Sequence, residues 1–332
     1  MVVRKYVYFI NENLTAPRPQ VWGKGRYRAL HRSACSVSVG GEEPILVRSG
    51  PMRYAAGESA KHCSEGALGQ DILYERHGHV RLITIDRAAK MNSMDFAASD
   101  EITERFREFD ADDKARIAVV TGADEKAFCA GADLKTYTMN FARAAPHEFR
   151  EKFTDGPGFG GITRNLQIDK PIVAAVNGYA VGGGLELALA CDIRFCAPHA
   201  MFGDQDVNWG FHACDGGLIR LPQIVGMGNA MEMILGGELI DAEHAHRIGL
   251  VNRIYPAECL LDETLSYAEM LATRAPLAQR FAKNVMMKAA DMPFEEALLL
   301  ESRSFRDLGD TEDLQEGTTA FREKRPAAFK GR

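Results

Sequence analysis

The chain has 332 residues, 46% of them hydrophobic and 26% charged, a composition typical of a globular protein with a substantial core. Its net charge is -6 at pH 7, so it lacks the excess of Lys and Arg that neutralises nucleic-acid phosphates. Its seven cysteines are scattered without a C-x-x-C pair, which favours a reducing compartment. No apolar run reaches the roughly 18 residues needed to span a bilayer. We therefore expect a cytoplasmic protein without nucleic-acid or membrane partners.

The first 68 residues differ in composition from the rest of the chain. They hold 10 Lys and Arg against 5 Asp and Glu, and they are punctuated by Gly, Pro and Ser without clear periodicity. We interpret residues 1–68 as an N-terminal extension that is either poorly ordered or the product of a start assigned too far upstream, with Met52 as the alternative start. The Pro-rich stretch TAPRPQ argues against a transit peptide.

From about residue 70, short strand-like runs alternate with helical patterns. Residues 79–85 alternate like a half-buried strand, whereas residues 116–122 and 170–178 are continuous apolar runs that end in Gly, as buried parallel strands do. Between the first two strands, apolar residues recur at helical spacing across 94–109. This order predicts an α/β fold with crossover helices.

The second half of the chain has a different pattern. After residue 217 it is mostly helical, with a short strand at VNRIY (251–255) and long helices across 260–307. We divide the sequence into the extension, a core at 69–255 and a helical C-terminal region at 256–332.

The segment NGYAVGGGLELALACD (177–192) places three consecutive glycines between a predicted strand and a predicted helix. Glycine lets a ligand approach the backbone closely, and free N–H groups at a helix start can stabilise an oxygen that becomes negative. The segment lacks the Lys and hydroxyl of a P-loop and the spacing of a dinucleotide fingerprint. Close packing of helix against strand is the alternative explanation for the glycines.

A second small-residue turn favours the functional interpretation. Residues 130–132, within KAFCAGADLK (126–135), also follow an apolar strand and expose backbone N–H groups. Two donors from two strand ends are what an oxyanion hole requires.

Other chemistry-bearing residues give weaker signals. His77 and His79, like His244 and His246, are two residues apart, and on a helix such a pair points to different faces. We therefore predict no metal site. No base accompanies the cysteines in the way that nucleophilic catalysis requires, and no G-x-S-x-G elbow is present.

Five stretches carry a resemblance to a known family. AFCAGADLK, NGYAVGGGLELALACDIR, FGDQDVNWG, AHRIGLVNRIYP and EGTTAFREKRPAAFKGR resemble, in this order and spacing, the enoyl-CoA hydratase/isomerase (crotonase) family over residues 72–332. The resemblance implies a crotonase-like spiral of β-β-α turns followed by a helical C-terminal region that forms oligomer contacts and covers coenzyme A. It also implies an acyl-CoA substrate, no separate cofactor, and a homotrimer or homohexamer.

The resemblance assigns roles within the two turns and beyond them. The backbone N–H groups of Ala132 and Gly183 would hold the thioester oxygen. Glu186 would position and activate water, and Asp206 would handle the C2 proton. Two such carboxyls repel each other when both are ionised, so we expect one of them to hold a proton near neutral pH.

Asp206 departs from the family pattern, since hydratases of this family usually have Glu there. Retained acidity favours reversible syn hydration of a trans-2-enoyl-CoA to a 3-hydroxyacyl-CoA, whereas the shorter side chain leaves enoyl-CoA or dienoyl-CoA isomerisation open. A binding protein of the same fold without activity is a further alternative. The acyl chain is not predicted.

The remaining site predictions concern the substrate. Residues 155–161 are expected to form a rim of the acyl pocket. Asp215 and His212 are candidate pocket residues, although the favoured explanation for Asp215 is the N-cap of a helix that begins near Gly216. By resemblance, the residues expected to bind the substrate and its coenzyme A are Lys90, Met91, Asp133, Leu134, Lys135, Gly182, Phe321 and Lys324.

Overall fold

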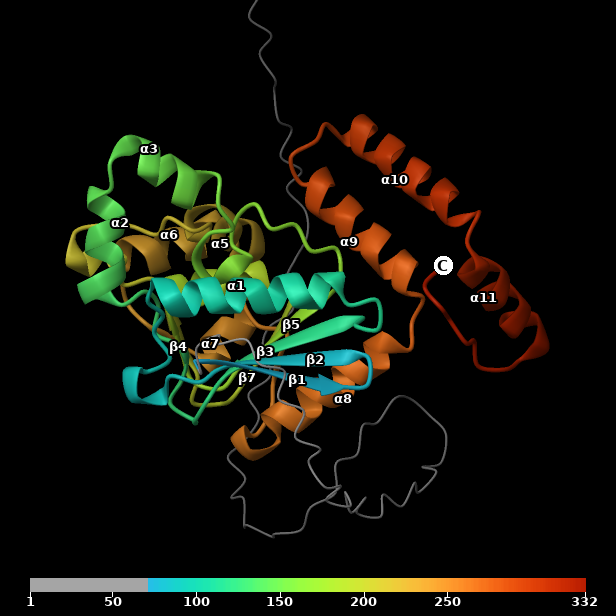
Figure 1. Cartoon of the computed structure of the whole chain (residues 1–332), viewed down its shortest axis with the longest axis horizontal. Coiled ribbons are helices and arrows are strands. Elements are labelled where there is room, and N and C mark those ends of the chain that lie inside the picture. The colour runs from blue at the N-terminus through green and yellow to red at the C-terminus, as the bar shows by residue number, and fades with distance from the viewer. Residues whose placement is uncertain (1–70) are drawn as a thin grey trace, which may run out of the picture. The chain divides into compact units, whose positions relative to one another are not determined.

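The computed structural model of the chain describes residues 71–332 (Figure 1). The predictions for residues 1–68, including the alternative start at Met52, lie outside the described residues. None of the helices between residues 71 and 332 is long and apolar enough to cross a membrane.

The larger of two β-sheets has the strand order β1-β2-β3-β5-β7-β10. β1 is antiparallel to β2, and the remaining neighbours are parallel. The three strands that the sequence predicted before residue 180 correspond to β2, β3 and β5. The strands of this sheet are β1 (Ile72–His77), β2 (Val80–Ile85), β3 (Ile117–Gly122), β5 (Ile172–Val176), β7 (Ile193–Cys196) and β10 (Arg253–Ile254).

The smaller sheet has the order β4-β6-β8-β9, with β4, β6 and β8 parallel and β9 antiparallel to β8. In the chain, β3 is followed by β4, β5 by β6, and β7 by β8. Each of these strand pairs is one turn of a spiral and adds one strand to each sheet. This is the predicted β-β-α spiral, and the fold class is confirmed. The strands are β4 (Ala127–Cys129), β6 (Tyr179–Val181), β8 (Met201–Gly203) and β9 (Ile240–Asp241).

The helices form for recognisable local reasons. Asp95 caps α1, since its carboxylate accepts the N–H of Ala98, and the buried side chains of Ile102, Phe106 and Phe109 lie along one face. The helices are α1 (Phe96–Ala111), α2 (Met139–Arg143), α3 (Pro146–Phe149), α4 (Gly183–Ala190), α5 (Gly217–Val225), α6 (Met227–Gly236), α7 (Ala242–Arg247), α8 (Leu260–Ala272), α9 (Pro276–Ala289), α10 (Phe294–Leu308) and α11 (Glu312–Glu323). Short helical turns lie at Leu134–Thr138, Arg150–Thr154, Phe159–Gly161 and Asp206–Trp209.

Both faces of the large sheet are buried, which explains its continuous apolar strands. In β3, Ala118 and Val120 join the main core with α1 and α4, whereas Ile117 and Val119 face α8. Figure 1 shows this sheet between α1 and α8. The first helix of the predicted C-terminal region thus packs on the core, and the domain boundaries remain a prediction.

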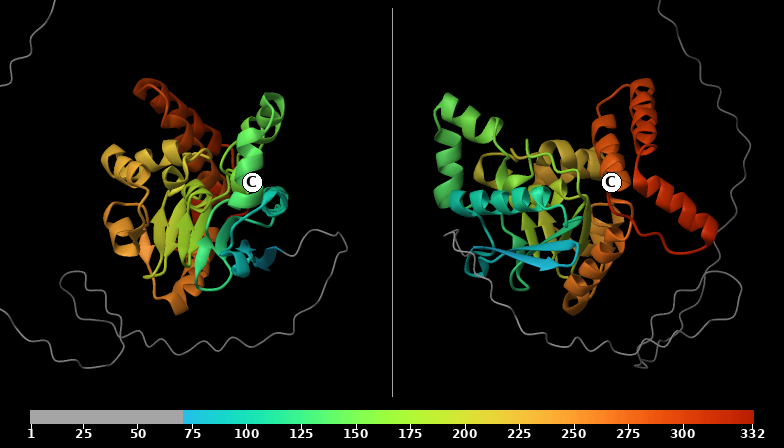
Figure 2. Two further views of the ribbon diagram at one scale, coloured as in Figure 1. Left: turned by 90° about the vertical axis from the view of Figure 1, so that its left-hand side faces the viewer. Right: turned by 45° about the vertical axis from the view of Figure 1, so that its right-hand side comes forward.

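Helices α9, α10 and α11 bury much less of their surface within the chain than α8 does. Figure 2 shows them on the opposite side of the sheets from α2 and α3. No residue of α10 is buried, and the side chains of Phe294 and Phe305 are each 73% exposed. Long amphipathic helices with one uncovered apolar face are typical of chains that associate with further copies.

Gly184 in α4 illustrates how tightly the spiral is packed. A Cβ at this position would lie 1.9 Å from the carbonyl oxygen of Cys129. We expect Gly184→Ala to destabilise the protein by about 1 to 3 kcal/mol, because the helix would have to move away from β4. Gly228→Ala in α6 is the matched control, since nothing lies within 4 Å of the added Cβ. Thermal unfolding of both variants measures the difference, and equal melting temperatures would contradict the prediction.

Candidate active site

The small sheet brings the predicted site residues together. Because β4, β6 and β8 are adjacent and parallel, the chain leaves all three strands at the same edge of the sheet. Ala132 follows β4, Gly183 follows β6, and Asp206 follows β8. The N–H of Gly182 donates to the carbonyl of Gly203 at 3.0 Å, which joins two of these exits directly.

The route of the chain differs in one respect from the sequence prediction. The glycines at 182–184 do not follow the strand of the large sheet, because β6 intervenes between β5 and α4. The turn at Gly178 is tight, since a Cβ there would lie 2.2 Å from the carbonyl oxygen of Lys126. The short run of residues 179–181 was too brief to be recognised as a strand, and pairing with β4 and β8 stabilises it.

The two turns that carry the predicted oxyanion donors lie next to each other. Gly183 is the first residue of α4, where a backbone N–H has no partner within the helix. Ala132 pairs with Met94 in a short parallel bridge that uses the carbonyl of Gly131 and the N–H of Asp133, so the N–H of Ala132 lies outside that bridge. A Cβ on Gly131 would lie 3.2 Å from the Gly183 nitrogen, which places the two turns in contact.

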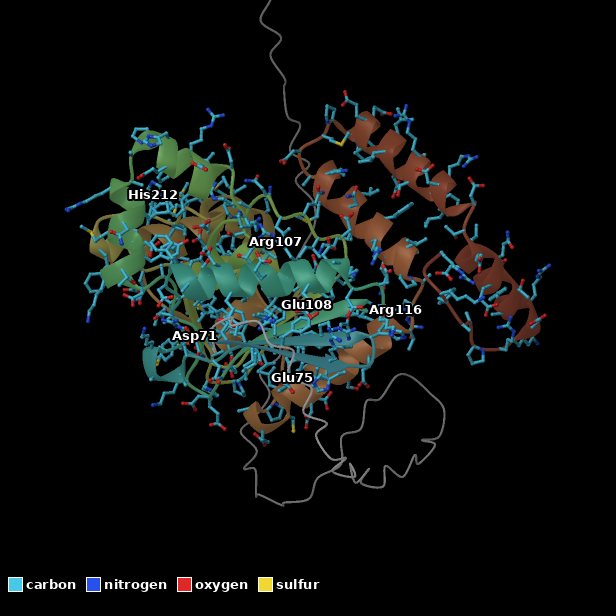
Figure 3. All side chains as sticks on the ribbon, viewed as in Figure 1. Asp71, Glu75, Arg107, Glu108, Arg116 and His212 are labelled. Atoms are coloured by element: carbon cyan, nitrogen blue, oxygen red, sulfur yellow. The ribbon has the colours of Figure 1, made fainter. Side chains whose placement is uncertain are left out.

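A cavity of about 670 Å³ opens at this edge. Lys90, Asp133 and Lys135 are not among the described residues that line it. Lys90 instead lies 3.8 Å from Asp95, with its side chain 55% exposed. The predicted site residues that do line the cavity are Met91, Ala132, Leu134, Gly182, Gly183, Glu186, Asp206, His212 and Asp215. Figure 3 shows His212 at the end of the molecule where α2 and α3 lie.

Glu186 extends from the first turn of α4 and is almost completely buried, with 3% of its surface exposed. Its Oε1 accepts the N–H groups of Asp215 at 2.6 Å and Gly217 at 2.8 Å. Burial, followed by the charge of Asp215, raises the pKa of Glu186 to about 8, against the opposing effect of these two hydrogen bonds. Its carboxyl therefore exchanges a proton near neutral pH.

Asp206 begins the short helical turn after β8. Burial, followed by the charge of Asp204, raises its pKa to about 7, against the opposing effect of His212. The carboxyl of Asp206 lies against Gly182, since a Cβ there would come within 3.1 Å of its Oδ1. Any side chain larger than glycine at position 182 would crowd this carboxyl.

The reason why one of the two site carboxyls holds a proton near neutral pH differs from the one predicted. Mutual repulsion between Glu186 and Asp206 was predicted to keep one of them protonated. Both pKa values are raised, but burial is the largest cause, and the strongest neighbouring charges are Asp215 for Glu186 and Asp204 for Asp206. Each carboxyl therefore has its own acidic neighbour.

The sequence analysis missed Asp204. It is 1% exposed, its Oδ1 accepts the N–H of Asp206 at 3.2 Å, and its carboxyl also forms a hydrogen bond with that of Asp206. Its Oδ2 is buried with no hydrogen-bond partner among the described residues. The only signal in the sequence was a second acid two positions before Asp206, immediately after a strand.

Asp215 lines the cavity, but it does not cap α5 as the favoured explanation proposed. The N-cap residue is Gly216, and no side chain forms a capping hydrogen bond. The Asp215 Oδ1 instead accepts the N–H of Phe159 at 3.1 Å and the Nε–H of Arg164 at 3.2 Å. Asp215 thus holds residues 159–164 in place through these hydrogen bonds. Phe159, within the segment predicted to form the rim, lines the cavity and is 1% exposed.

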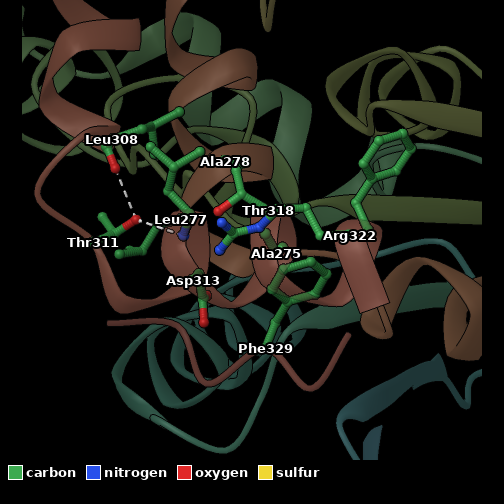
Figure 4. Close-up of a pocket in the computed structure, with 12 residues that line it drawn as sticks. Ala275, Leu277, Ala278, Leu308, Thr311, Asp313, Thr318, Arg322 and Phe329 are labelled. Atoms are coloured by element: carbon green, nitrogen blue, oxygen red, sulfur yellow. Dashed lines mark hydrogen bonds between the residues drawn. The ribbon is translucent and has the colours of Figure 1, made fainter. Parts of the chain in front are cut away.

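The two C-terminal residues expected to bind coenzyme A do not reach this cavity within one chain. Phe321 is 86% exposed and lines a separate apolar groove of about 470 Å³. Figure 4 shows part of that groove, with Thr311 hydrogen-bonded to the carbonyl of Leu308 at its edge. Lys324 ends α11 in a left-handed conformation and is not among the described residues lining the cavity.

Metal and thiol chemistry find no support among residues 71–332. No group of three or more His, Cys, Asp or Glu in this part of the chain has metal-binding geometry. Burial raises the pKa of Cys129 to about 12, which keeps this thiol protonated.

Comparisons with known proteins agree with the fold. Residues 75–332 match the model of the enoyl-CoA hydratase/isomerase family. The chain is 40% identical to (E)-benzylidenesuccinyl-CoA hydratase of Thauera aromatica over 78% of its own length and 99% of that protein. It is 38% identical to carnitinyl-CoA dehydratase of Citrobacter koseri, over 80% of its own length and 100% of the other.

A solved structure shows the same relationship. An enoyl-CoA hydratase from Geobacillus kaustophilus superposes with a TM-score of 0.72 and 35% sequence identity, covering 79% of this chain and 98% of that one. The chain belongs to the enoyl-CoA hydratase/isomerase family. It is a hydro-lyase of the crotonase type, as its hydratase and dehydratase relatives are.

Proposed function

We propose that the enzyme adds water reversibly across the C2=C3 bond of a trans-2-enoyl-CoA, with Glu186 and Asp206 as its acid and base. The observation that carries this proposal is that two backbone amides, the buried carboxyl of Glu186 and the half-buried carboxyl of Asp206 line one cavity. Addition of water requires a base for the water and an acid for C2. Both carboxyls have pKa values within about a unit of neutral pH.

The backbone amides stabilise the negative charge that develops during the reaction. When water adds at C3, electron density moves onto the thioester oxygen, and the N–H groups of Ala132 and Gly183 would hold that oxygen. Each donor of such a hole lowers the barrier by about 3 kcal/mol. This stabilisation requires no metal or redox cofactor, and coenzyme A enters only as part of the substrate.

The two directions of the reaction need the proton on different carboxyls at the start. For hydration, Glu186 takes a proton from water and Asp206 gives one to C2. For dehydration the same groups start with Glu186 protonated and Asp206 ionised. Because both pKa values are raised toward neutral pH, one proton held by either carboxyl can serve the reaction in each direction.

The direct test is a spectrophotometric assay with purified protein. Loss of the enoyl-thioester absorbance of crotonyl-CoA, or its gain from 3-hydroxybutyryl-CoA, reports the reaction in each direction. Activity only on a 3-enoyl-CoA or a dienoyl-CoA would replace the proposal with isomerisation. Absence of turnover across a broad panel of CoA thioesters would support a binding protein.

We expect kcat/KM to be bell-shaped in pH, with a maximum near pH 7.5. The active form carries one proton over the two carboxyls. Activity therefore rises as the first proton is lost near pH 7 and falls as the second is lost near pH 8. A profile that is flat from pH 5 to 9 would contradict this assignment.

Asp204→Asn provides the control for the acidic limb of this profile. Removing the charge of Asp204 lowers the pKa of Asp206, whereas the side-chain oxygen of Asn still accepts the N–H of Asp206. The acidic limb should therefore move to lower pH further than the basic limb, because Asp204 is the strongest neighbouring charge for Asp206 but only the smallest of the influences that raise the pKa of Glu186. Movement of the basic limb alone would show that Asp204 acts on a different group.

We also propose that several copies of the chain associate. The apolar faces of α9 to α11, with Met286 69% exposed, would be covered by further copies of the chain in a homotrimer or homohexamer. Phe321 and Lys324 would then complete the coenzyme A site of a neighbouring subunit. Light scattering coupled to size-exclusion chromatography measures the assembly.

A further inference from the structure

A cluster of aromatic side chains forms one end of the cavity. The ring centroids of Phe96 and Tyr137 are 4.3 Å apart and stacked, and those of Phe141 and Phe153 are 4.3 Å apart in an edge-to-face arrangement. Phe149 meets Phe141 at 4.9 Å. Four rings of this cluster line the cavity, and they are Tyr137, Phe141, Phe149 and Phe159.

The cluster begins at the reaction centre. A Cβ on Gly183 would meet three atoms of the Phe159 ring at 2.9 to 3.1 Å, so this ring lies directly against a predicted oxyanion donor. Tyr137 contacts Phe159 edge-to-face at 5.7 Å, and from there the rings continue toward α2 and α3. An acyl group whose thioester lies at Gly183 therefore meets aromatic rings next to its reacting carbons.

The aromatic end offers no partner for an additional charge on the acyl group. No Lys or Arg is among the described residues lining the cavity. The hydroxyl of Tyr137 is already hydrogen-bonded to Ser99. Burying a carboxylate there without a partner would be unfavourable, whereas an uncharged ring gains stacked or edge-to-face contacts.

We propose that the acyl group of the preferred substrate carries an uncharged aromatic ring on C3, as in a 3-aryl-3-hydroxyacyl-CoA and its 3-aryl-2-enoyl-CoA product. This inference rests on the proposed function and specifies its substrate class. In the elimination, the C2–H and C3–O bonds break, the C2=C3 bond forms, and water leaves with the proton from C2. Conjugation with the ring favours the alkene, so the reaction is measured as dehydration.

The test compares kcat/KM for 3-hydroxy-3-phenylpropionyl-CoA with that for 3-hydroxybutyryl-CoA, following the absorbance of the enoyl product. We expect the wild-type enzyme to prefer the aryl substrate at least about tenfold, as the contacts of one aromatic side chain predict. Phe141→Leu should reduce this ratio about tenfold. Phe153→Leu is the matched control, since Phe153 belongs to the cluster but is not among the cavity-lining residues, and it should keep the ratio.

The outcomes separate the two proposals. Turnover of 3-hydroxybutyryl-CoA with equal or better efficiency than the aryl substrate overturns the aromatic assignment and leaves the hydratase proposal intact. The same loss of ratio in both variants also overturns it, because the effect would then come from packing in the cluster. If the enzyme prefers an aryl substrate with an added carboxymethyl group on C2, the proposal that the acyl group is uncharged is overturned. Turnover of none of these substrates overturns the hydratase proposal itself.

Discussion

Glu186→Gln is expected to lower kcat for hydration by about 100- to 10,000-fold, the usual contribution of a positioned acid or base. The amide cannot exchange a proton with water or the 3-hydroxyl group. Its carbonyl oxygen can still accept the N–H groups of Asp215 and Gly217, so the fold and the KM should change little. Steady-state kinetics with crotonyl-CoA and thermal unfolding measure the two effects separately.

Glu101→Gln is the matched control for this experiment. Glu101 is 5% exposed and burial raises its pKa, as for Glu186, but it belongs to α1 and is not among the described residues lining the cavity. We expect its replacement to leave kcat unchanged. If Glu186→Gln kept kcat within tenfold of the wild type, the acid and base would have to be sought elsewhere in the cavity.

Asp206→Asn is the second change with a large expected effect. We predict a loss of kcat of about 100- to 10,000-fold for hydration, because the amide cannot deliver a proton to C2. Asn retains the length of the side chain against Gly182, so substrate binding should persist. Retention of full activity on a 3-enoyl-CoA together with loss of hydration would assign the enzyme an additional isomerase activity that needs Glu186 alone.

Asp206→Glu tests whether activity requires the shorter side chain of Asp at this position. The carboxyl packs against Gly182 in the present structure, and one more methylene would move it by about 1.5 Å. A displacement of this size lowers the rate about 100-fold. An Asp206→Glu enzyme as active as the wild type would indicate that the cavity accepts either length.

The strongly patterned elements were predictable from the sequence. The apolar run 116–122 and the periodicity across 94–109 correspond to β3 and α1, because burial on both faces of a sheet and on one face of a helix leaves a direct pattern in the residues. β6 was not predicted, since three residues carry no period and the strand exists through its neighbours. Asp204 was missed for a related reason, since only its burial distinguishes it from a surface acid.

The residues of the two small turns and the acids after them were also identified from the sequence, and the glycines between strand and helix indicated a backbone site. Their motifs lie in contiguous stretches, and local sequence carries that information directly. What only the tertiary structure decided is which groups act on each other. Asp204 and Asp215, rather than Glu186 and Asp206 between themselves, are the neighbouring charges that most raise the two pKa values. Rings from α2 and α3 line the same cavity. Desolvation and charge depend on distances across the fold, and these distances are set when the parallel strands of the small sheet end at one edge.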